Sequence, residues 1–217
     1  MVHYQRIVTE FLDENAYILY NDNKECIIID PGFGFELINS FITSNHLKPL
    51  AILATHAHFD HIASAYNFIK EYDIDFYLCQ DERLILENFE KAANFWGIGN
   101  VGSDIVVKRP QASHWINNDE KNLTIGSFNF LIIFNPGHSP GSISFVIEDL
   151  VFCGDLIFRG SIGRTDLPLS SPRDMSKSLE FFVNSFTSDC KLLTGHGEET
   201  TLYEELRTNP YLIKHEK

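Results

Sequence analysis

The chain has 217 residues, of which 44% are hydrophobic, and this composition fits one globular domain, 1–217, with a sizeable core. Lys and Arg number 17 against 30 Asp and Glu, so the net charge of −13 disfavours binding to nucleic acid or to an anionic membrane. No apolar run approaches the ~18–20 residues of a transmembrane helix, and the first residues lack a secretory signal, so a cytoplasmic location is expected.

Short runs rich in Val, Ile, Phe and Tyr alternate with helical patterns along the chain. The runs predict strands at 16–20, 26–30, 50–54, 76–79, 128–134, 143–147, 150–153 and 191–193, with tight turns at 126–127 and 148–149. Helices are predicted over 62–72, from a cap at Asp81 to about residue 95, after an N-cap at Ser171, and over 201–207. Segment 94–103, rich in Gly and aromatic residues, is either a surface connection or a flap over a site.

Three histidines and one aspartate lie within six residues, directly after the strand predicted at 50–54. They are His56, His58, Asp60 and His61. His56 and His58 are two apart in extended chain and can converge on one ion, whereas Asp60 and His61 lie past the turn and can reach a second. A single histidine is usually plain polar surface, and this is the interpretation for His3, His46, His114 and His215. The clustered four instead predict a metal site.

Three further residues repeat this placement after an apolar strand: His138, Asp155 and His196. His138 can complete the first ion and His196 the second, while the two oxygens of Asp155 can bridge both. All seven ligands offer nitrogen or oxygen, so two zinc ions are favoured, with iron and manganese as alternatives.

Two other chemistries are weighed and set aside. The four cysteines form no C-x-x-C pair and lie in or beside strand-like runs, so buried reduced thiols are expected, including Cys153, two residues before Asp155. Residues 137–141 spell G-x-S-x-G, but a nucleophile elbow needs a helix straight after the serine, and here Pro140 and a predicted strand follow. The serine-hydrolase interpretation is therefore rejected.

The H-x-H-x-D-H run, followed by a lone His, then Asp, then His, resembles the metallo-β-lactamase superfamily over most of the chain. The resemblance implies an α+β fold, a four-layer αββα sandwich, with a dinuclear site along one edge of the paired sheets and the seven residues above as its ligands. The motifs at 30–32, 135–141, 152–155 and 163–166 are similar to those of the glyoxalase II-like hydrolases, in their short single-domain form.

The resemblance implies hydrolysis of an S-(2-hydroxyacyl)glutathione type of thioester by a metal-bridged hydroxide, with Asp60 orienting the nucleophile and taking its proton. The expected partner is a small molecule, an anionic acyl thioester; the sequence makes no prediction of oligomeric state. Asp30 resembles a carboxylate that steadies the site, or else caps the turn at 31–32. Arg164 either binds an anionic substrate tail or pairs with Asp166.

Departures from the family leave alternatives open. True β-lactamases with two zincs often use Cys or His where Asp155 stands, which disfavours antibiotic hydrolysis. The longer basic C-terminal region of full-length glyoxalase II enzymes is missing after His196, which puts glutathione recognition in question. Persulfide dioxygenases are similar too, and hold one iron at positions matching His56, His138 and Asp155. An ester or lactone hydrolase is a further alternative, whereas the complete ligand set argues against a binding module without turnover.

Overall fold

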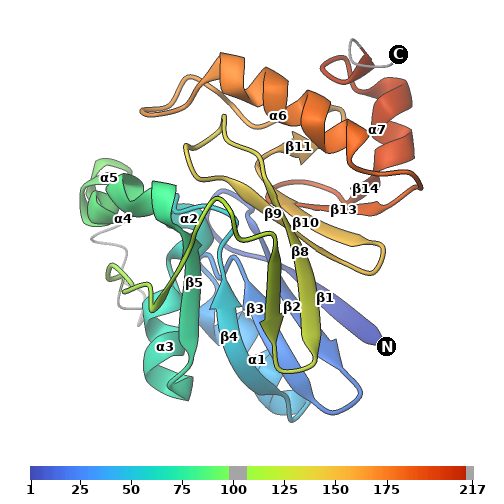
Figure 1. Ribbon diagram of the computed structural model, residues 1–217. Coiled ribbons are helices and arrows are strands. Elements are labelled where there is room, and N and C mark those ends of the chain that lie inside the picture. The colour runs from blue at the N-terminus through green and yellow to red at the C-terminus, as the bar shows by residue number, and fades with distance from the viewer. Residues whose placement is uncertain (98–106, 214–217) are drawn as a thin grey trace. The chain divides into compact units, whose positions relative to one another are not determined.

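The computed structural model describes residues 1–97 and 107–213, which divide into two compact units, Met1–Ile116 and Asn117–Lys217 (Figure 1). Each unit contains one six-stranded sheet and a hydrophobic core of its own. Two main sheets with several helices match the predicted α+β class. The interpretation of residues 1–217 as one domain stays a prediction.

The sheet of the first unit has its strands in chain order, β1-β2-β3-β4-β5-β6. These are β1 (Val2–Val8), β2 (Asn15–Asn21), β3 (Glu25–Ile29), β4 (Lys48–Leu53), β5 (Asp75–Cys79) and β6 (His114–Ile116). The first three pair antiparallel, and β3 to β6 pair parallel. Because parallel strands need crossovers, helices separate them. The carboxyl ends of β3, β4 and β5 therefore lie along the same edge of this sheet.

The helices of the first unit are α1 (Phe35–Ser44), α2 (Phe59–Ile62), α3 (Ala65–Tyr72), the 3₁₀ turn η1 (Gln80–Glu82), α4 (Arg83–Glu87) and α5 (Phe89–Phe95). Ile38 and Ile42 of α1 and Phe68 of α3 pack in one cluster with Ile28 of β3 and Ile52 of β4. Strands buried on both faces explain the nearly continuous apolar runs of β3 and β4.

The sheet of the second unit has the order β14-β13-β10-β9-β8-β7. Its strands are β7 (Asn122–Ile125), β8 (Phe128–Phe134), β9 (Ile143–Ile147), β10 (Leu150–Gly154), β13 (Lys191–Thr194) and β14 (Thr200–Thr201), and a separate hairpin contains β11 (Ile157–Phe158) and β12 (Ser161–Ile162). The predicted turns at 126–127 and 148–149 join β7 to β8 and β9 to β10 as two-residue hairpins. Only β10 and β13 run parallel in this sheet.

Two helices cover this second sheet, α6 (Pro172–Asn184) and α7 (Leu202–Thr208) (Figure 1). Ser171 caps α6 as predicted, since its hydroxyl accepts a hydrogen bond from the Asp174 N–H, and Pro172 occupies the first helical position. Met175 and Leu179 of α6 pack in one cluster with Val151 of β10 and Leu192 of β13.

The elements differ from the sequence prediction in three places. The helix expected over 62–72 is divided between two helices, since α2 ends at Ile62 and α3 begins at Ala65; between them the Ser64 hydroxyl donates to the Gly32 carbonyl. Asp81 does not cap a helix but lies inside η1, and α4 and α5 meet at Asn88. The prediction missed α1 and the strands β1, β6, β7, β11, β12 and β14.

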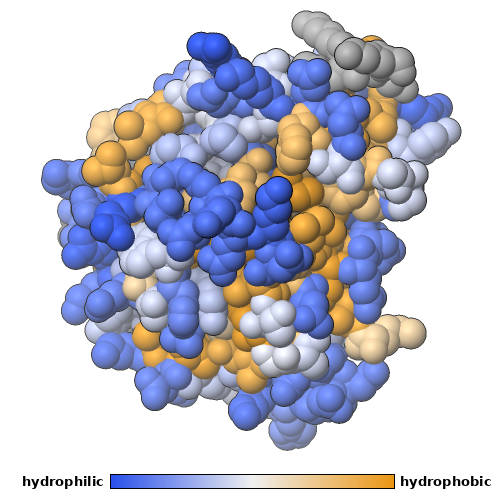
Figure 2. Space-filling model, in the orientation of Figure 1, coloured by the Kyte–Doolittle hydropathy of each residue, from blue (hydrophilic) through white to orange (hydrophobic). Residues whose placement is uncertain are grey.

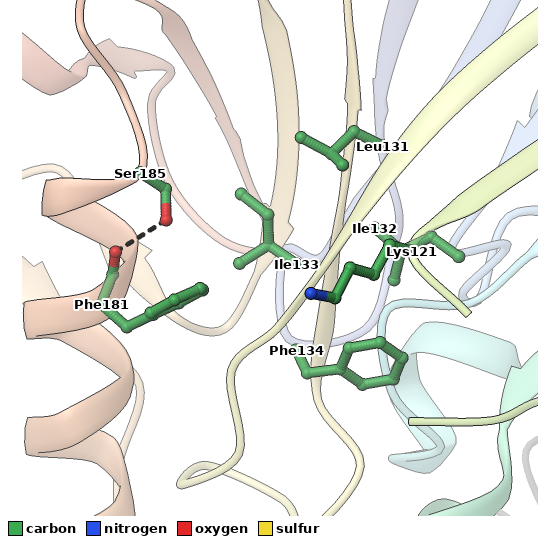
Figure 3. Close-up of a pocket in the computed structure, with 7 residues that line it drawn as sticks. All are labelled: Lys121, Leu131, Ile132, Ile133, Phe134, Phe181 and Ser185. Carbon is green, nitrogen blue, oxygen red and sulfur yellow. Dashed lines mark hydrogen bonds between the residues drawn. The ribbon is translucent and has the colours of Figure 1, made fainter. Parts of the chain in front are cut away.

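The second unit also has an apolar hollow of about 390 Å³ between β8 and α6. Figure 3 shows Leu131 and Ile133 of β8 and Phe181 of α6 around it, and Figure 2 shows hydrophobic side chains gathering over the region of β8. None of the seven predicted ligands lines this hollow.

Among the described residues, no helix has the length and apolar character that a membrane span requires.

Candidate metal centre

Four of the predicted ligands cluster in the first unit, at the carboxyl end of β4. The His56 ring lies 4.7 Å from the His58 ring and 4.1 Å from the His61 ring, measured between centroids. Asp60 and His61 belong to α2, which starts one residue after His58. The Asp60 carboxylate lies 4.0 Å from Nε2 of His61. Three imidazoles and one carboxylate are thus within reach of one another, as the spacing predicts.

Thr55 and Asp30 fix the orientation of two of these imidazoles. The Thr55 hydroxyl lies 3.1 Å from Nδ1 of His56, and Oδ2 of Asp30 lies 3.0 Å from Nδ1 of His61. Asp30 also accepts from the Thr55 N–H at 2.7 Å and from its hydroxyl at 2.6 Å. Contacts at Nδ1 leave Nε2 of each ring for coordination, which is how outer carboxylates support metal-binding histidines. Asp30 therefore has the geometry of the steadying carboxylate.

Two buried glutamates beside the cluster were not predicted. Glu82 accepts a hydrogen bond of 2.7 Å from the N–H of Ala57, which stands between His56 and His58, and so holds the turn that presents them. Glu14 lies 3.9 Å from Nδ1 of His61 and accepts from the Thr9 hydroxyl at 3.1 Å. Both glutamate side chains are fully buried.

The environment of Glu14 changes its acidity. Burial raises the pKa of Glu14 well above the usual value for a glutamate; the nearby Asp30 and Asp60 raise it further, and His61 and the Thr9 bond oppose the increase. Gly32 makes this close approach possible, because a Cβ at that position would overlap the Glu14 carboxylate and the Asp60 carbonyl. Within the motif at 30–32, Gly32 thus allows Glu14 and Asp60 to pack closely beside the cluster of predicted ligands.

The other three predicted ligands cluster in the second unit, each just after a strand. His138 follows β8, Asp155 follows β10 and His196 follows β13. Nε2 of His138 lies 3.2 Å from Oδ2 of Asp155, and Nε2 of His196 lies 3.7 Å from the same oxygen. One carboxylate oxygen of Asp155 therefore lies near two imidazoles, and the predicted bridging of two ions by its two oxygens stays a prediction.

The loop at 163–166 supports this second group through its main chain. The Arg164 carbonyl lies 2.8 Å from Nδ1 of His138, which directs Nε2 of that ring toward Asp155. A Cβ at Gly163 would overlap the Asp155 carbonyl, so a glycine is required for the loop to pass this close.

The Arg164 side chain is committed elsewhere. Its Nε and Nη2 donate to the Asp166 carboxylate at 2.7 and 2.9 Å, and both side chains are exposed. This pair lowers the pKa of Asp166 and raises that of Arg164. Of the two predicted roles of Arg164, the pairing with Asp166 is the one formed here.

The donor set suits divalent first-row ions. Each group offers imidazole nitrogens and carboxylate oxygens, with outer partners that fix three of the rings at Nδ1. All four cysteines are free and buried, as predicted. Burial raises the pKa of the Cys153 thiol strongly, and its sulfur lies 3.6 Å from the carbonyls of Ile157 and Leu193, so it stays a protonated core thiol.

The remaining predictions concern residues outside these groups. His3 and His114 lie at the surface, where they contact Asp22 and Asp75, and His46 is also exposed; His215 lies outside the described residues. Segment 94–103, interpreted as either a surface connection or a flap, begins within α5, and its residues from 98 onward also lie outside the described part of the chain.

The sequence matches the model of the metallo-β-lactamase superfamily over residues 9–196. A probable metallo-hydrolase, YqgX of Bacillus subtilis, is 39% identical over 93% of this chain and 93% of its own length. The hydroxyacylglutathione hydrolase GloC of Haemophilus influenzae is 30% identical over 94% of this chain and 95% of its own.

Two solved structures extend the likeness to the fold. The crystal structure of the B3 metallo-β-lactamase BLEG-1 has a TM-score of 0.86 and 37% identity, covering 97% of this chain and 99% of that one. The di-iron-bound form of TTHA1623 has a TM-score of 0.83 and 34% identity, covering 96% and 100%. The predicted metallo-β-lactamase fold is thereby confirmed, and it is a fold that binds divalent metals. The chain belongs to the metallo-β-lactamase superfamily and is a metal-dependent hydrolase of that family.

Proposed function

We propose that the chain is a thioester hydrolase of the hydroxyacylglutathione type, working with two divalent ions held by both ligand groups. One ion takes His56, His58 and His138, the other takes Asp60, His61 and His196, and Asp155 is shared. The observation that supports this most is the position of the Asp155 carboxylate in the second unit. Its Oδ2 faces His138 and His196, which belong to different ions in this assignment.

When bound, the ions would act as Lewis acids and lower the pKa of water toward ~7, so that a nucleophile exists at neutral pH. The chain's own groups prepare the reaction around them. Asp30 keeps the proton of His61 on Nδ1 and the Arg164 carbonyl does the same for His138, which reserves Nε2 of both rings for the ions. The Asp60 carboxylate orients the attacking water and takes its proton.

The thioester assignment is supported by the comparison with GloC. That hydrolase is matched over 95% of its own length at 30% identity, so the likeness extends over nearly all of a protein with that named activity. BLEG-1 is named as a B3 metallo-β-lactamase, so a β-lactam is the competing substrate to test. The shared donor Asp155 is a carboxylate rather than a cysteine or histidine, which favours the thioester over the β-lactam.

The test combines metal content with substrate assays on the purified protein. We expect two divalent ions per chain, zinc in preference to iron or manganese, and release of thiol from S-lactoylglutathione, with no turnover of a β-lactam. Asp155→Asn should lose both the ions and the thiol release, because the bridging charge is removed. Asp119→Asn, which makes the same change at an exposed position, should keep both.

Three outcomes would contradict the proposal. Thiol release that survives complete metal removal would refute the metal mechanism. Unchanged metal content in Asp155→Asn would refute the bridging assignment. One iron per chain, with oxygen uptake on glutathione persulfide, would instead identify the mononuclear dioxygenase chemistry that the sequence also resembles.

A further inference from the structure

A second hollow lies within the first unit, and no residue of the predicted metal centre lines it. It has a volume of about 720 Å³, and its lining residues belong to α3, α4, the segment 108–112 and the strand β6 that follows it; α3 and α4 are labelled in Figure 1. This volume falls in the range of ~300–1,000 Å³ typical of small-molecule sites. We call it the basic pocket, after the four cations among its lining residues, Lys70, Arg83, Lys108 and Arg109; Tyr66 and Trp115 also line it.

The charge of the basic pocket is opposite to that of the protein. Four cations and a single carboxylate, Glu87, line it, which gives a local charge of +3 in a chain of net charge −13. In the described ranges, 1–97 and 107–213, no ion pair involves Lys70, Arg83, Lys108 or Arg109. At physiological ionic strength, screening acts over ~8 Å, so the potentials of neighbouring cations inside one hollow add.

Three of the four cations, all of them exposed, lie near aromatic rings. Nζ of Lys108 lies 4.9 Å from the centroid of the Tyr66 ring, and Nζ of Lys70 lies 5.9 Å from the same centroid. The Arg83 guanidinium lies 4.8 Å from the centroid of the Trp115 ring. A ring face attracts a cation without using its N–H donors, so these groups remain able to donate hydrogen bonds to an anion.

Lys70 and Lys108 lie beside the same tyrosine ring. Their ammonium groups are 5.9 and 4.9 Å from its centroid, and both side chains are exposed. An anion bound beside this ring would therefore have two cations of opposite charge nearby. Arg83 adds a planar fork of donors that matches phosphate oxygens, and buried Leu86, Pro110 and Ala112 supply apolar wall for the rest of a ligand.

We propose that the basic pocket binds a small phosphorylated organic molecule, at a site separate from the metal centre. A phosphate monoester is close to a dianion above pH 7, so its negative charge complements the positive charge of the pocket. Its organic part contacts the apolar wall. The proposal does not depend on the thioester function.

Trp115 gives a reporter inside the pocket. The chain has two tryptophans, so Trp96→Phe leaves Trp115 as the single tryptophan. In this background we would titrate the metal-loaded protein with phenyl phosphate, and with inorganic phosphate and phenol as partial probes, and follow the tryptophan fluorescence. We expect a saturable change with phenyl phosphate, weaker binding of inorganic phosphate, no effect of phenol, and weaker binding as salt is raised.

The variants locate the binding. The double variant Lys70→Gln/Lys108→Gln should weaken phenyl phosphate binding at least about 10-fold, and Arg83→Gln should weaken it independently. The control Lys48→Gln/Lys177→Gln removes two exposed lysines outside the pocket and should leave the affinity unchanged. Circular dichroism and melting temperature check that each variant is folded.

Two results would overturn the proposal. The first is the lack of any fluorescence change with phenyl phosphate at concentrations of about 10 mM, which correspond to negligible affinity. The second is binding that the folded pocket variants leave intact, because the phosphate would then be held elsewhere, for example at the metal ions.

Discussion

Asp30→Asn tests whether the buried carboxylate controls the chemistry of His61. Asparagine has the same size and tolerates the left-handed backbone of this position, where φ is 47°. The carboxylate accepts at three places, from the Thr55 N–H and hydroxyl and at Nδ1 of His61. All three residues are at most 2% exposed, so water cannot replace a lost bond.

The amide of asparagine cannot satisfy all three contacts. If its oxygen keeps the Thr55 N–H, its NH₂ group faces Nδ1 of His61 and forces the proton of that ring onto Nε2, where it blocks coordination. If the amide is flipped, the Thr55 N–H is left buried without an acceptor, at a cost of ~1–3 kcal/mol. Either way, we expect metal affinity at the second ion to fall about 10- to 100-fold.

Competition with a chromophoric chelator measures the affinity, and the melting temperature of the metal-free protein measures the fold. Asp22→Asn is the matched control, because Asp22 also contacts an imidazole, that of His3 at 3.2 Å, but at the surface. We expect the control to bind metal as the parent does. If Asp30→Asn kept its affinity within about threefold, a change of less than 1 kcal/mol, the orienting role of Asp30 would be refuted.

Three shorter predictions concern the same unit and the thiols. Asp60→Ala should empty the second ion site and abolish hydrolysis while the fold survives. Metal analysis counts the ions and circular dichroism checks the fold. A folded variant that still holds two ions would contradict this prediction. Gly32→Ala should lower the melting temperature and the metal content together, because its Cβ has no room beside Glu14. Burial raises the pKa of Cys26, Cys79 and Cys190 from 9.0 to about 12, so the folded state holds these protons longer than the unfolded state does. The free energy of unfolding should therefore fall as pH rises from 9.0 to about 12. At pH 8, thiol reagents should react with these cysteines only after denaturation. Rapid reaction of the native protein would contradict the burial of the thiols.

The parts of the fold that the sequence predicted are those with a strong local signal. Strands β3 and β4 are continuous apolar runs, and Ser171-Pro172 marks the start of α6 through chemistry confined to four residues. Strand β1 was missed because it is half-exposed at a sheet edge and its pattern is neither apolar nor clearly alternating. Helix α1 was missed because Gly34 caps it without any side chain to signal the start.

The same distinction applies to the candidate site, where residues with a local sequence signal were predicted and residues without one were missed. The predicted ligands share a local feature, a polar residue just after an apolar strand, and within each unit the structure places them together. The assignment of all seven to two ions stays a prediction. Glu82 and Glu14 carry no such feature, and Glu82 lies 25 residues from the Ala57 N–H that it accepts. Only the parallel pairing of β4 with β5 brings these segments together, which sequence spacing does not reveal.

Arg164 shows why a motif residue need not act through its side chain. The group that orients His138 is the Arg164 carbonyl, and every residue type has one, whereas the guanidinium already donates twice to Asp166. We therefore expect Arg164→Ala to keep the metal content and the KM for S-lactoylglutathione, while Gly163→Ala, which would overlap the Asp155 carbonyl, lowers metal content. A KM raised about 10-fold in Arg164→Ala, with kcat and metal content unchanged, would show that the guanidinium leaves Asp166 to bind the anionic tail of the substrate. Gly163→Ala thus tests the role of the main-chain course of the loop at 163–166, and Arg164→Ala tests the role of its guanidinium charge.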